Sequence, residues 1–370
     1  MADTFKILSI DGGGIRGVFP AMLLANYEAE LKAKGVEKWQ VYQNFDLICG
    51  TSTGGIMAIA LSLGIPAKEI YEMYLNNAGL IFGDKKSFIR QIWRSAHKRD
   101  ELEKLVRETF AKHNNAKDPR LVDCKTPVMI PIYDMMEGRP SVLKSKYHPA
   151  FVRDFHIPAY QAAMATSAAP TYFDPYSSSY TDLNDIEKPF ANKIDGGVWA
   201  NNPTLNGIIE AQKAFGVKLE ELSVLSIGTG HQKFCDAGIK YNKGIINWIL
   251  RQLRIKKKSE MRKKFGIKYW IYSDDKKRLI DVFMQGQSQQ VQNLISLLHK
   301  GIDKGEQENF KYLRIDTELN ESCNIEMDET DTERLKKLAE KATIEFQNNA
   351  TNIIKNFGSG SRRTDSQRTV

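Results

Sequence analysis

Residues 45–63 read FDLICGTSTGGIMAIALSL: an apolar strand pattern, a serine between glycines, and then small and aliphatic residues typical of a buried helix. The pattern G-x-S-x-G around Ser52 arises by chance on the order of 0.1 times in a chain of this length. Between a strand and a helix it is typical of a nucleophile elbow, a tight turn that lifts a serine hydroxyl above the edge of a sheet. The helix that follows adds amide donors and a positive dipole beside that hydroxyl. The alternative is an ordinary strand-to-helix turn with an inert serine.

Strand patterns like the one before Ser52 recur along the chain and are separated by helical patterns. Several are nearly continuous apolar runs, as expected for strands that are covered on both faces. They lie at residues 5–10, 45–49, 127–133 and 222–227. Strands that alternate with helices predict a mainly parallel sheet in a layered α/β fold.

The pattern changes after about residue 230. Residues 291–298 have apolar groups at helical spacing, and Gly301 is placed to end that helix. The same spacing predicts a further helix over residues 335–346, with Thr330 and Glu333 offering a capping box at its start. We therefore expect additional helices in the C-terminal part of the chain.

We expect a single domain over residues 1–357. The motifs described here fall within residues 5–230, and residues 231–357 form a helical and basic C-terminal part. Within that part, residues 310–315 are compatible with a late strand. Residues 358–370, GSGSRRTDSQRTV, contain few apolar groups and predict a disordered tail.

The chain has 370 residues and a net charge of +8, and its basic character is concentrated in one segment. Residues 251–278 contain twelve Lys or Arg and three acids. Such a surplus predicts a surface that meets lipid head groups or a phosphate-bearing ligand. Four scattered cysteines without metal-type spacing indicate reduced thiols in a cytosolic protein. We recognise neither a signal peptide nor a membrane-spanning stretch.

A second glycine-rich stretch, DGGGIRG at residues 11–17, directly follows the first predicted strand. It satisfies G-x-G-x-x-G, the dinucleotide-binding fingerprint, which also requires an acid at the end of a second strand about twenty residues on. Glu28 and Glu30 instead fall inside or just after a helical pattern. In the other interpretation the glycine amides form an oxyanion loop that points at a developing negative charge, and Arg16 fixes the loop or adds charge. The loop alone leaves both interpretations open.

The third motif is Asp195-Gly196-Gly197, an acid and two glycines that suit a turn presenting a carboxylate with little steric cover. In isolation such a turn is more often an ordinary surface turn. A serine nucleophile usually has a histidine base, yet none of the six histidines follows a motif that would place it beside the serine. His231, after residues 228–230, is the best placed of them. If a carboxylate takes the serine proton directly, Asp195 is the candidate.

The three motifs, in this order, resemble those of the patatin-like phospholipases. Two further stretches are similar as well, ATSAAPTYF at residues 165–173 and SIGTG at residues 226–230. The resemblance implies a three-layer α/β/α fold with a mainly parallel central sheet, and a Ser-Asp dyad that cleaves acyl esters of membrane phospholipids. It implies Ser52 as the nucleophile and Asp195 as the base. The implied oxyanion hole consists of Gly12, Gly13, Gly14 and Arg16. No metal and no organic cofactor is implied.

A narrower resemblance is to the phospholipase effectors of bacterial anti-phage signalling. It lies in the compact form and the basic C-terminal part rather than in a motif. Those effectors are activated by cyclic oligonucleotides and degrade the membrane of their own cell. The resemblance implies a cyclic oligonucleotide activator, contacts between its phosphates and basic side chains of residues 251–278, and a homo-oligomer on activation.

The membrane surface is the other partner that the sequence indicates. Residues 245–258 combine an apolar face with a basic flank, which is typical of a segment that lies in an anionic interface. An ordinary helix docked on the core has the same pattern. Residues 88–99, which include Trp93, are a second and weaker candidate. We expect a cytoplasmic protein with peripheral membrane association when active.

The competing class of protein is a nucleotide-binding α/β protein that uses residues 12–17 for phosphate and has no hydrolase activity. Reaction of Ser52 with a fluorophosphonate probe separates the two classes. The chain has no recognised module that reads DNA or RNA bases, so we expect no sequence-specific nucleic-acid partner.

Overall fold

The computed structural model describes residues 4–82, 99–231, 239–241, 260–262, 270, 278–300, 308–319 and 325–361. Its centre is a sheet with the strand order β10-β7-β1-β2-β3-β6-β5, in which β4 also pairs with β3. The strands of this sheet are β1 (Phe5–Ile10), β2 (Leu47–Gly50), β3 (Val128–Asp134), β4 (Arg139–Lys144), β5 (Tyr176–Thr181), β6 (Glu187–Asp195), β7 (Leu222–Ile227) and β10 (Lys311–Ile315). A separate antiparallel pair consists of β8 (Ile239–Tyr241) and β9 (Glu260–Arg262).

The strands from β10 to β3 are parallel, and β4, β5 and β6 complete the sheet as antiparallel strands. β1, β2 and β7 are buried along their whole length, which explains their nearly continuous apolar sequence. The strands predicted at residues 5–10 and 222–227 have these bounds. The late strand predicted at residues 310–315 is β10. The predicted mainly parallel sheet is confirmed.

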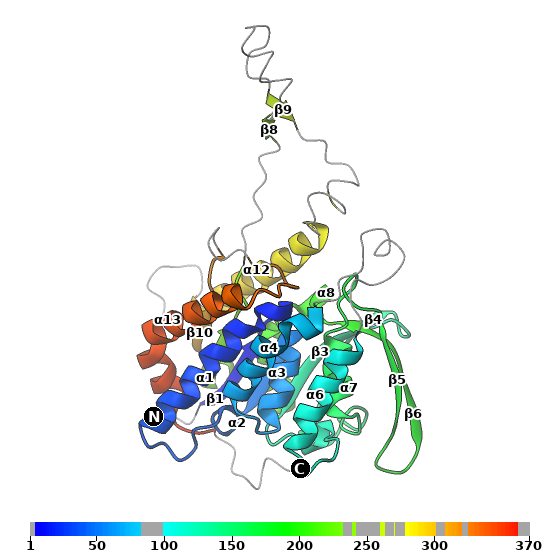
Figure 1. Ribbon diagram of the computed structural model, residues 1–370. Helices are drawn as coiled ribbons and strands as arrows, with labels where there is room; N and C mark the ends of the chain where they lie inside the picture. Colours follow the sequence, from blue (N-terminus) through cyan, green and yellow to red (C-terminus); the bar gives the residue numbers. More distant parts are fainter. Residues whose placement is uncertain are drawn as a thin grey trace.

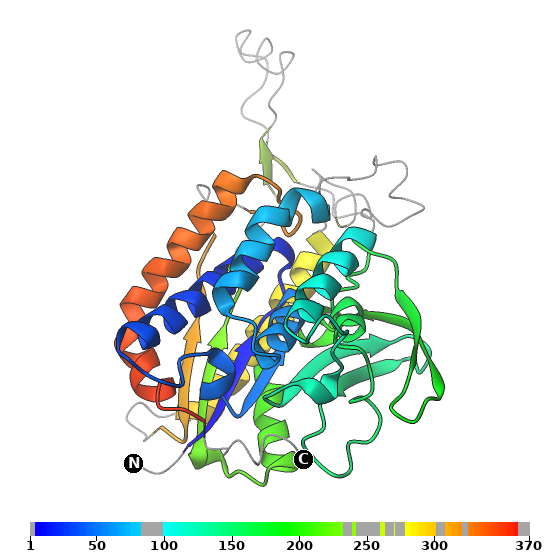
Figure 2. The same ribbon diagram turned by 60° about the horizontal axis from the view of Figure 1, so that its bottom comes forward.

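Helices cover both faces of the sheet (Figures 1 and 2). Along β1, Leu8 and Ile10 belong to an apolar core shared with α1, α3, α4, α7 and α13, whereas Ile7 belongs to a second core shared with α9 and α12. Two cores on opposite faces make the three-layer α/β/α arrangement that the sequence predicts. The α-helices are α1 (Val18–Ala33), α2 (Val41–Asn44), α3 (Thr53–Ser62), α4 (Ala67–Phe82), α6 (Asp100–Lys112), α7 (Ala159–Thr166), α8 (Gly197–Ala200), α9 (Thr204–Ala214), α12 (Arg278–Lys300) and α13 (Thr332–Phe357). Short 3₁₀ turns lie at η1 (Gly14–Gly17), η2 (Leu121–Asp123) and η3 (Leu219–Glu221).

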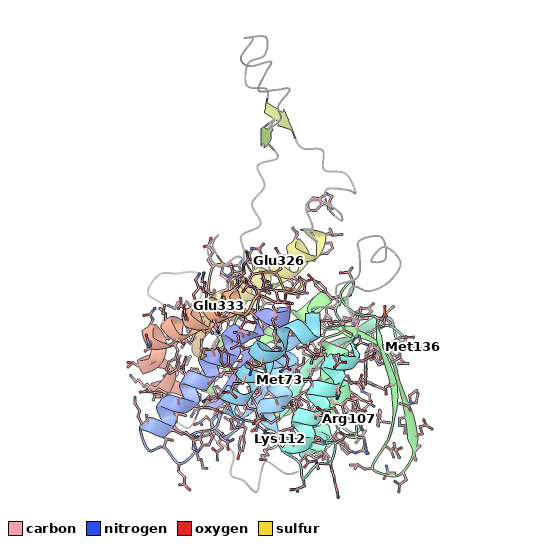
Figure 3. All side chains as sticks on the ribbon, viewed as in Figure 1. Met73, Arg107, Lys112, Met136, Glu326 and Glu333 are labelled. Atoms are coloured by element: carbon pink, nitrogen blue, oxygen red, sulfur yellow. The ribbon has the colours of Figure 1, made fainter. Side chains whose placement is uncertain are left out.

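The C-terminal helix α13 begins at a different cap from the one predicted. Its N-cap is Asp331, whose carboxylate accepts hydrogen bonds from the N–H groups of Glu333 (2.9 Å) and Arg334 (3.4 Å). The Glu333 side chain, at the start of the helix in Figure 3, pairs with Lys336 instead. The predicted capping box of Thr330 and Glu333 is therefore wrong, because the carboxylate one residue further on satisfies the free N–H groups itself.

The chain continues past α13 as an anchored segment. Lys6 Nζ donates hydrogen bonds to Ser359 Oγ (2.7 Å) and to the carbonyl oxygen of Gly360 (2.5 Å). The N–H of Gly360 donates to Asn44 Oδ1 at 3.0 Å. The predicted disordered tail over residues 358–370 is thus corrected for residues 358–361, and residues 362–370 lie outside the described part.

Several predicted features lie outside the residues that the structure describes. They include Gly301, most of the basic stretch at residues 251–278, and both candidate membrane segments except Arg99. Within the described ranges, no helix is long and apolar enough to cross a membrane. The same ranges contain no group of three or more His, Cys, Asp or Glu side chains arranged to bind a metal ion.

Candidate active site

Ser52 occupies the turn between β2 and α3. Its φ of 56° and ψ of −124° lie outside the regions that non-glycine residues ordinarily adopt, and strained residues of this kind cluster at functional sites. A Cβ at Gly50 would lie 2.0 Å from the carbonyl oxygen of Gly54, so only glycine fits there. The turn has the tight strand-to-helix geometry that the pattern predicts.

Hydrogen bonds hold this turn in its strained conformation. The N–H of Ser52 donates to Thr166 Oγ1 (3.1 Å), and that hydroxyl donates onward to the carbonyl oxygen of Pro131 (2.7 Å). The carbonyl oxygen of Ser52 accepts from the N–H groups of Gly55 (2.8 Å) and Ile56 (3.0 Å) in the first turn of α3. With its backbone fixed in this way, Ser52 is 8% exposed and lines a cavity.

Asp195 is the last residue of β6 and lies beside β3. Its Oδ1 accepts a hydrogen bond from the N–H of Gly197 at 2.6 Å. Burial raises the pKa of this carboxyl to about 7, and hydrogen bonds from the Ser52 side chain and from Gly197 oppose the rise. The fold therefore brings the serine and the carboxylate of two distant motifs to the same cavity, near enough for the Ser52 side chain to affect the pKa of the carboxyl.

The glycine loop after β1 is held by neighbours from other parts of the chain. The N–H of Gly12 donates to the carbonyl oxygen of Asn201 (3.1 Å), and the carbonyl oxygen of Gly12 accepts from Thr229 Oγ1 (2.9 Å). Gly14 has a φ of +58°, and a Cβ there would lie 2.3 Å from the carbonyl oxygen of Met327. Both constraints require glycine at position 14.

The four residues of the predicted oxyanion hole have two different placements. Gly13 and Gly14 line the cavity with Ser52, and no acceptor for either N–H is recorded among the described residues. Gly12 is not among the lining residues, and its N–H is already bonded to Asn201. Arg16 does not line the cavity either; its N–H and its Nε both donate to the carbonyl oxygen of Gly13 at 3.3 Å. Arg16 thus contacts the backbone of the loop.

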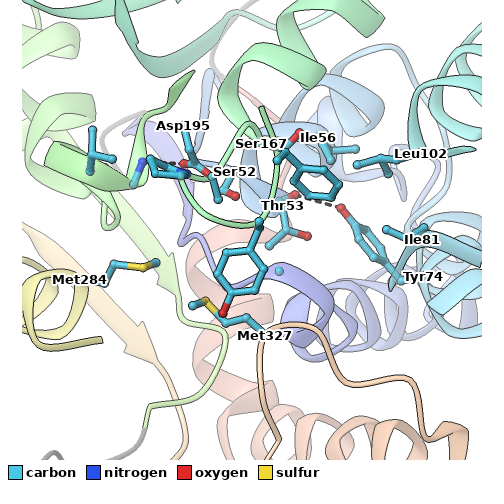
Figure 4. A pocket seen from close by; sticks show the side chains of 18 of the residues that line it. Ser52, Thr53, Ile56, Tyr74, Ile81, Leu102, Ser167, Asp195, Met284 and Met327 are labelled. Atoms are coloured by element: carbon cyan, nitrogen blue, oxygen red, sulfur yellow. Dashed lines mark hydrogen bonds between the residues drawn. The ribbon is translucent and has the colours of Figure 1, made fainter. Parts of the chain in front are cut away.

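The cavity has a volume of about 190 Å³ and a mostly apolar lining. Ser52 and Asp195 lie beside each other in it, as Figure 4 shows. The Tyr74 hydroxyl is turned inward and donates to the carbonyl oxygen of Thr53 at 3.3 Å. The apolar lining, which the sequence patterns did not predict as a unit, comprises Ile56, Tyr74, Ile81, Leu102, Ala169, Pro170, Tyr172, Phe173, Val198, Phe283, Met284 and Met327.

α12 reaches this site from the C-terminal part of the chain. Its Phe283 lines the cavity and is 65% exposed. One turn further along, Gln287 Oε1 accepts from the N–H of Asn201, and the Asn201 side-chain amide donates to Ser288 Oγ (3.1 Å). Because the carbonyl oxygen of Asn201 holds Gly12, the same helix contacts both the cavity and the support of the glycine loop.

No histidine lines the cavity in the described part of the chain. His231, the best placed of the histidines in the sequence, faces Asp316 instead, with 3.3 Å between Nδ1 and Oδ2. The side-chain hydrogen bond to Asp316 raises the pKa of His231. The acidic residue that lines the cavity with Ser52, among the described residues, is Asp195.

Arg314, on β10, belongs to the surroundings of the site and was missed by the motif analysis. Its guanidinium donates to both carboxylate oxygens of Asp11, at 3.0 Å and 2.6 Å, and to Asp316 Oδ2 at 3.0 Å. Burial raises the pKa of Asp11 to about 6, although the guanidinium opposes the rise. The only local signal was a charged residue within the otherwise strand-like sequence KYLRI.

The sequence is similar to those of known proteins. The sequence model of one family, described as patatin-like phospholipase, matches residues 8–207. A cGAMP-activated phospholipase of Vibrio cholerae is 35% identical over 235 residues, which cover 60% of this chain and 64% of the relative, so the match spans less than two thirds of that relative's length. Patatin-like protein 2 of Arabidopsis thaliana is 30% identical over 350 residues, which cover 87% of this chain and 78% of that protein.

Among solved structures, VipD from Legionella pneumophila matches 92% of this chain and 67% of its own, with 10% sequence identity and a TM-score of 0.34. Structural similarity at this level supports no inference about the residues of the site.

Proposed function

The chain belongs to the patatin-like phospholipase family, and from this membership we propose that it is a lipid acyl hydrolase of the phospholipase A type, with Ser52 as nucleophile and Asp195 as base. The observation that carries the proposal is that Ser52 and Asp195 lie beside each other in a mostly apolar cavity (Figure 4), where the Ser52 side chain lowers the pKa that burial raises for the Asp195 carboxyl. A nucleophile with an adjacent base is the arrangement that acyl transfer requires.

In the first step Asp195 accepts the Ser52 proton while the serine oxygen attacks the carbonyl carbon of the ester. The tetrahedral intermediate then expels a lysophospholipid, whose oxygen takes the proton from Asp195 as the C–O bond breaks. In the second step water attacks the acyl-enzyme and gives a proton to Asp195, which returns it to Ser52 as the fatty acid leaves. A base with a pKa of about 7 is suited to both proton transfers near neutral pH.

The amides of Gly13 and Gly14 are the proposed donors to the oxyanion. Both residues line the cavity beside Ser52, whereas the N–H of Gly12 is engaged by Asn201. We therefore assign Gly12 and Arg16 to holding the loop. Gly13 and Gly14 are assigned to stabilising the negative charge of the oxyanion. Loss of one such donor typically lowers turnover by about 10²–10³.

The apolar part of the cavity is the proposed site of the acyl chain. Ile56, Leu102 and Phe173 contribute to a wall without charged groups. Burial of such surface against a hydrocarbon chain is favourable by about 25 cal/mol per Å². It also keeps water away from the ester until the acyl-enzyme has formed.

The competing proposal, phosphate binding by residues 12–17, is not favoured by the surroundings of the loop. The cavity that Gly13 and Gly14 line also holds the carboxylate of Asp195 and an apolar wall. A charged carboxylate there would repel a phosphate group, and the wall offers phosphate no hydrogen bonds.

We further propose that a cyclic oligonucleotide activates the hydrolase, as a step in anti-phage defence. The similarity to the cGAMP-activated phospholipase of Vibrio cholerae and the basic composition of residues 251–278 support this. The enzyme would be cytoplasmic and would bind peripherally to anionic membranes, with a homo-oligomer as the active form.

A single domain over residues 1–357 is also part of the proposal. β10 lies in the same sheet as β1, and Leu335 and Leu338 of α13 share the apolar core of α1. Contacts of this kind between the two ends of the chain favour one folding unit over two.

Fatty-acid release from defined phospholipid vesicles tests the hydrolase. We expect Ser52→Ala and Asp195→Asn to fold normally and to lower turnover by roughly 10⁴-fold to 10⁶-fold, because each removes a group that takes part in bond making. Reaction with a fluorophosphonate probe should disappear in Ser52→Ala.

Matched controls are Ser62→Ala, a buried serine at the other end of α3, and Asp154→Asn, a carboxylate paired with Arg153. Both should keep wild-type activity per folded molecule. Full activity in either dyad variant would overturn the proposal.

A further inference from the structure

We propose that Arg314 is a positioning residue for ester hydrolysis, which holds Asp11 and through it aligns the Gly13 and Gly14 amides with the reacting carbonyl group. The inference rests on the hydrolase function proposed above. Arg314 lies outside residues 8–207, the segment that the family model matches.

The contact between Arg314 and Asp11 is bidentate. One nitrogen donates to Oδ1 at 3.0 Å and the other to Oδ2 at 2.6 Å. The same two nitrogens also donate to Ser226 Oγ (2.8 Å) and to Asp316 Oδ2 (3.0 Å). The side chains of Arg314 and Asp11 are 13% and 5% exposed. A planar guanidinium that makes four such hydrogen bonds is fixed in place, and so is the carboxylate that it holds.

Asp11 connects this cluster to the oxyanion loop. It is the first residue after β1 and directly precedes Gly12, and its N–H donates to the carbonyl oxygen of Ile227. The three glycines that follow have no side chains with which to anchor themselves. The direction in which the loop leaves the sheet therefore depends on the residue at its start, together with the backbone hydrogen bonds of Gly12 to Asn201 and Thr229.

The other end of the loop is held independently. The N–H of Ile15 donates to the carbonyl oxygen of Met327 (2.9 Å), and Arg16 holds the carbonyl oxygen of Gly13. With this end fixed, a rotation at Asp11 changes the direction of the two amides between the ends without detaching the loop. Misplacement of a catalytic group by about 1 Å costs on the order of 10² in rate.

A lysine cannot replace this arginine in the same role. Its ammonium group is a point charge that cannot bind both oxygens of Asp11 and reach Asp316 in one plane. Arg314→Lys therefore keeps the net charge of the cluster and removes the bidentate contact with Asp11. The variant distinguishes a role of Arg314 in aligning the loop from a role in neutralising the buried Asp11 carboxylate.

The test compares 4-nitrophenyl butyrate with its thionoester, in which sulfur replaces the carbonyl oxygen. Sulfur accepts hydrogen bonds weakly, so the thionoester gains little from the loop amides in any variant. We expect Arg314→Lys to lower kcat for the ester by about 10², to leave its KM within about threefold, and to lower kcat for the thionoester far less. The ester-to-thionoester ratio of kcat should fall by more than tenfold.

Asp11→Asn is an isosteric substitution that should lower the ester-to-thionoester ratio of kcat in the same way. It serves as a second variant if Arg314→Lys reduces the amount of folded protein. The control is Lys144→Met, which breaks the partly buried pair of Lys144 and Glu210 between β4 and α9. It should lower stability and leave the ester-to-thionoester ratio at the wild-type value.

An unchanged ratio in both Arg314→Lys and Asp11→Asn would overturn the inference, because a purely structural role lowers both rates equally. Wild-type protein that hydrolyses the ester no faster than Ser52→Ala would instead overturn the hydrolase proposal, and this inference with it.

Discussion

Asp195 is buried, although its proposed role as a base requires it to carry a charge. Burial raises the pKa of its carboxyl from 3.8 to about 7. Between these values the folded state binds more protons than the unfolded chain, so the free energy of unfolding falls as the pH rises. Burial also raises the pKa of Glu28 to about 7 and that of Asp11 to about 6, which adds to the same trend. The charge that hydrolysis needs therefore destabilises the fold.

We expect activity and stability to change with pH in opposite directions. As Asp195 loses its proton, kcat for a neutral ester should rise about tenfold per pH unit below pH 6 and level off above about pH 7. Over the same range Tm should fall. A pH profile of kcat and a series of thermal melts measure the two quantities.

Asp195→Asn is the control, because it removes this titration and keeps the shape of the side chain. At pH 8 its Tm should exceed that of the wild type, and at pH 5 the difference should be smaller. A lower Tm than the wild type at pH 8 would contradict a destabilising charge at this position.

At the level of single residues, Ser52 and Asp195 could be proposed from the sequence because each lies in a short glycine-containing pattern. The difference between Gly12 and its neighbours could not, because it depends on which N–H is already bonded to Asn201. Arg314 could not either, since its partner Asp11 lies 303 positions away. Side-chain contacts over such separations leave no local pattern.

Among the elements, α13 offers a direct measurement of what a cap contributes. The carboxylate of Asp331 accepts from two N–H groups of the first turn. We expect Asp331→Ala to lower the free energy of unfolding by about 1 kcal/mol, the usual contribution of such a cap. Activity per folded molecule should not change, and denaturant unfolding monitored by circular dichroism gives the value.

Thr330→Ala is the matched control, because Thr330 is the neighbouring residue that the sequence suggested as the cap. Its loss should change stability by less than about 0.5 kcal/mol. A larger loss of stability in Thr330→Ala than in Asp331→Ala would contradict the Asp331 cap and support the capping box predicted from the sequence.

The elements that could be predicted are those whose burial is uniform. β1 and β7 are buried along their whole length and mostly apolar, so their bounds could be predicted from their sequences. β4 is mostly exposed or half-buried, β5 alternates between exposed and half-buried positions after its first residue, and both contain several polar residues, so neither was predicted. Their antiparallel pairing depends on neighbours that only the folded sheet provides.

In the molecule as a whole, segments late in the sequence pack beside segments near its start. β10 joins the sheet beside β7, which is the neighbour of β1, and residues 358–361 are tied to Lys6 and Asn44. The site is therefore assembled from segments that span most of the chain. Its dependence on the late strand could not be foreseen from motifs that end near residue 230.

We expect the whole protein to respond to a cyclic dinucleotide. Addition of cGAMP should raise Tm and increase fatty-acid release from vesicles, since a ligand at 100 times its Kd stabilises the folded state by about 2.7 kcal/mol. Replacement of Lys256, Lys257 and Lys258 by Gln should weaken this response. Thermal shift and vesicle assays at two salt concentrations measure it.

The charge-matched control replaces Lys188, Lys213 and Lys218, three exposed lysines elsewhere on the surface, by Gln. These changes should leave both responses intact. If cyclic dinucleotides of several base compositions produce neither a shift in Tm nor a change in release, activation by such a ligand is wrong for this protein.

The position of β10 late in the chain has a consequence for biosynthesis. Translation delivers the elbow serine and its carboxylate partner well before the strand that carries Arg314, and domains assemble from the amino end as they emerge. Under the proposed mechanism a nascent polypeptide that does not yet include β10 lacks Arg314 and hydrolyses esters slowly. Full activity against lipids thus arises only after that strand has been made, which spares nearby bilayers from copies that lack it.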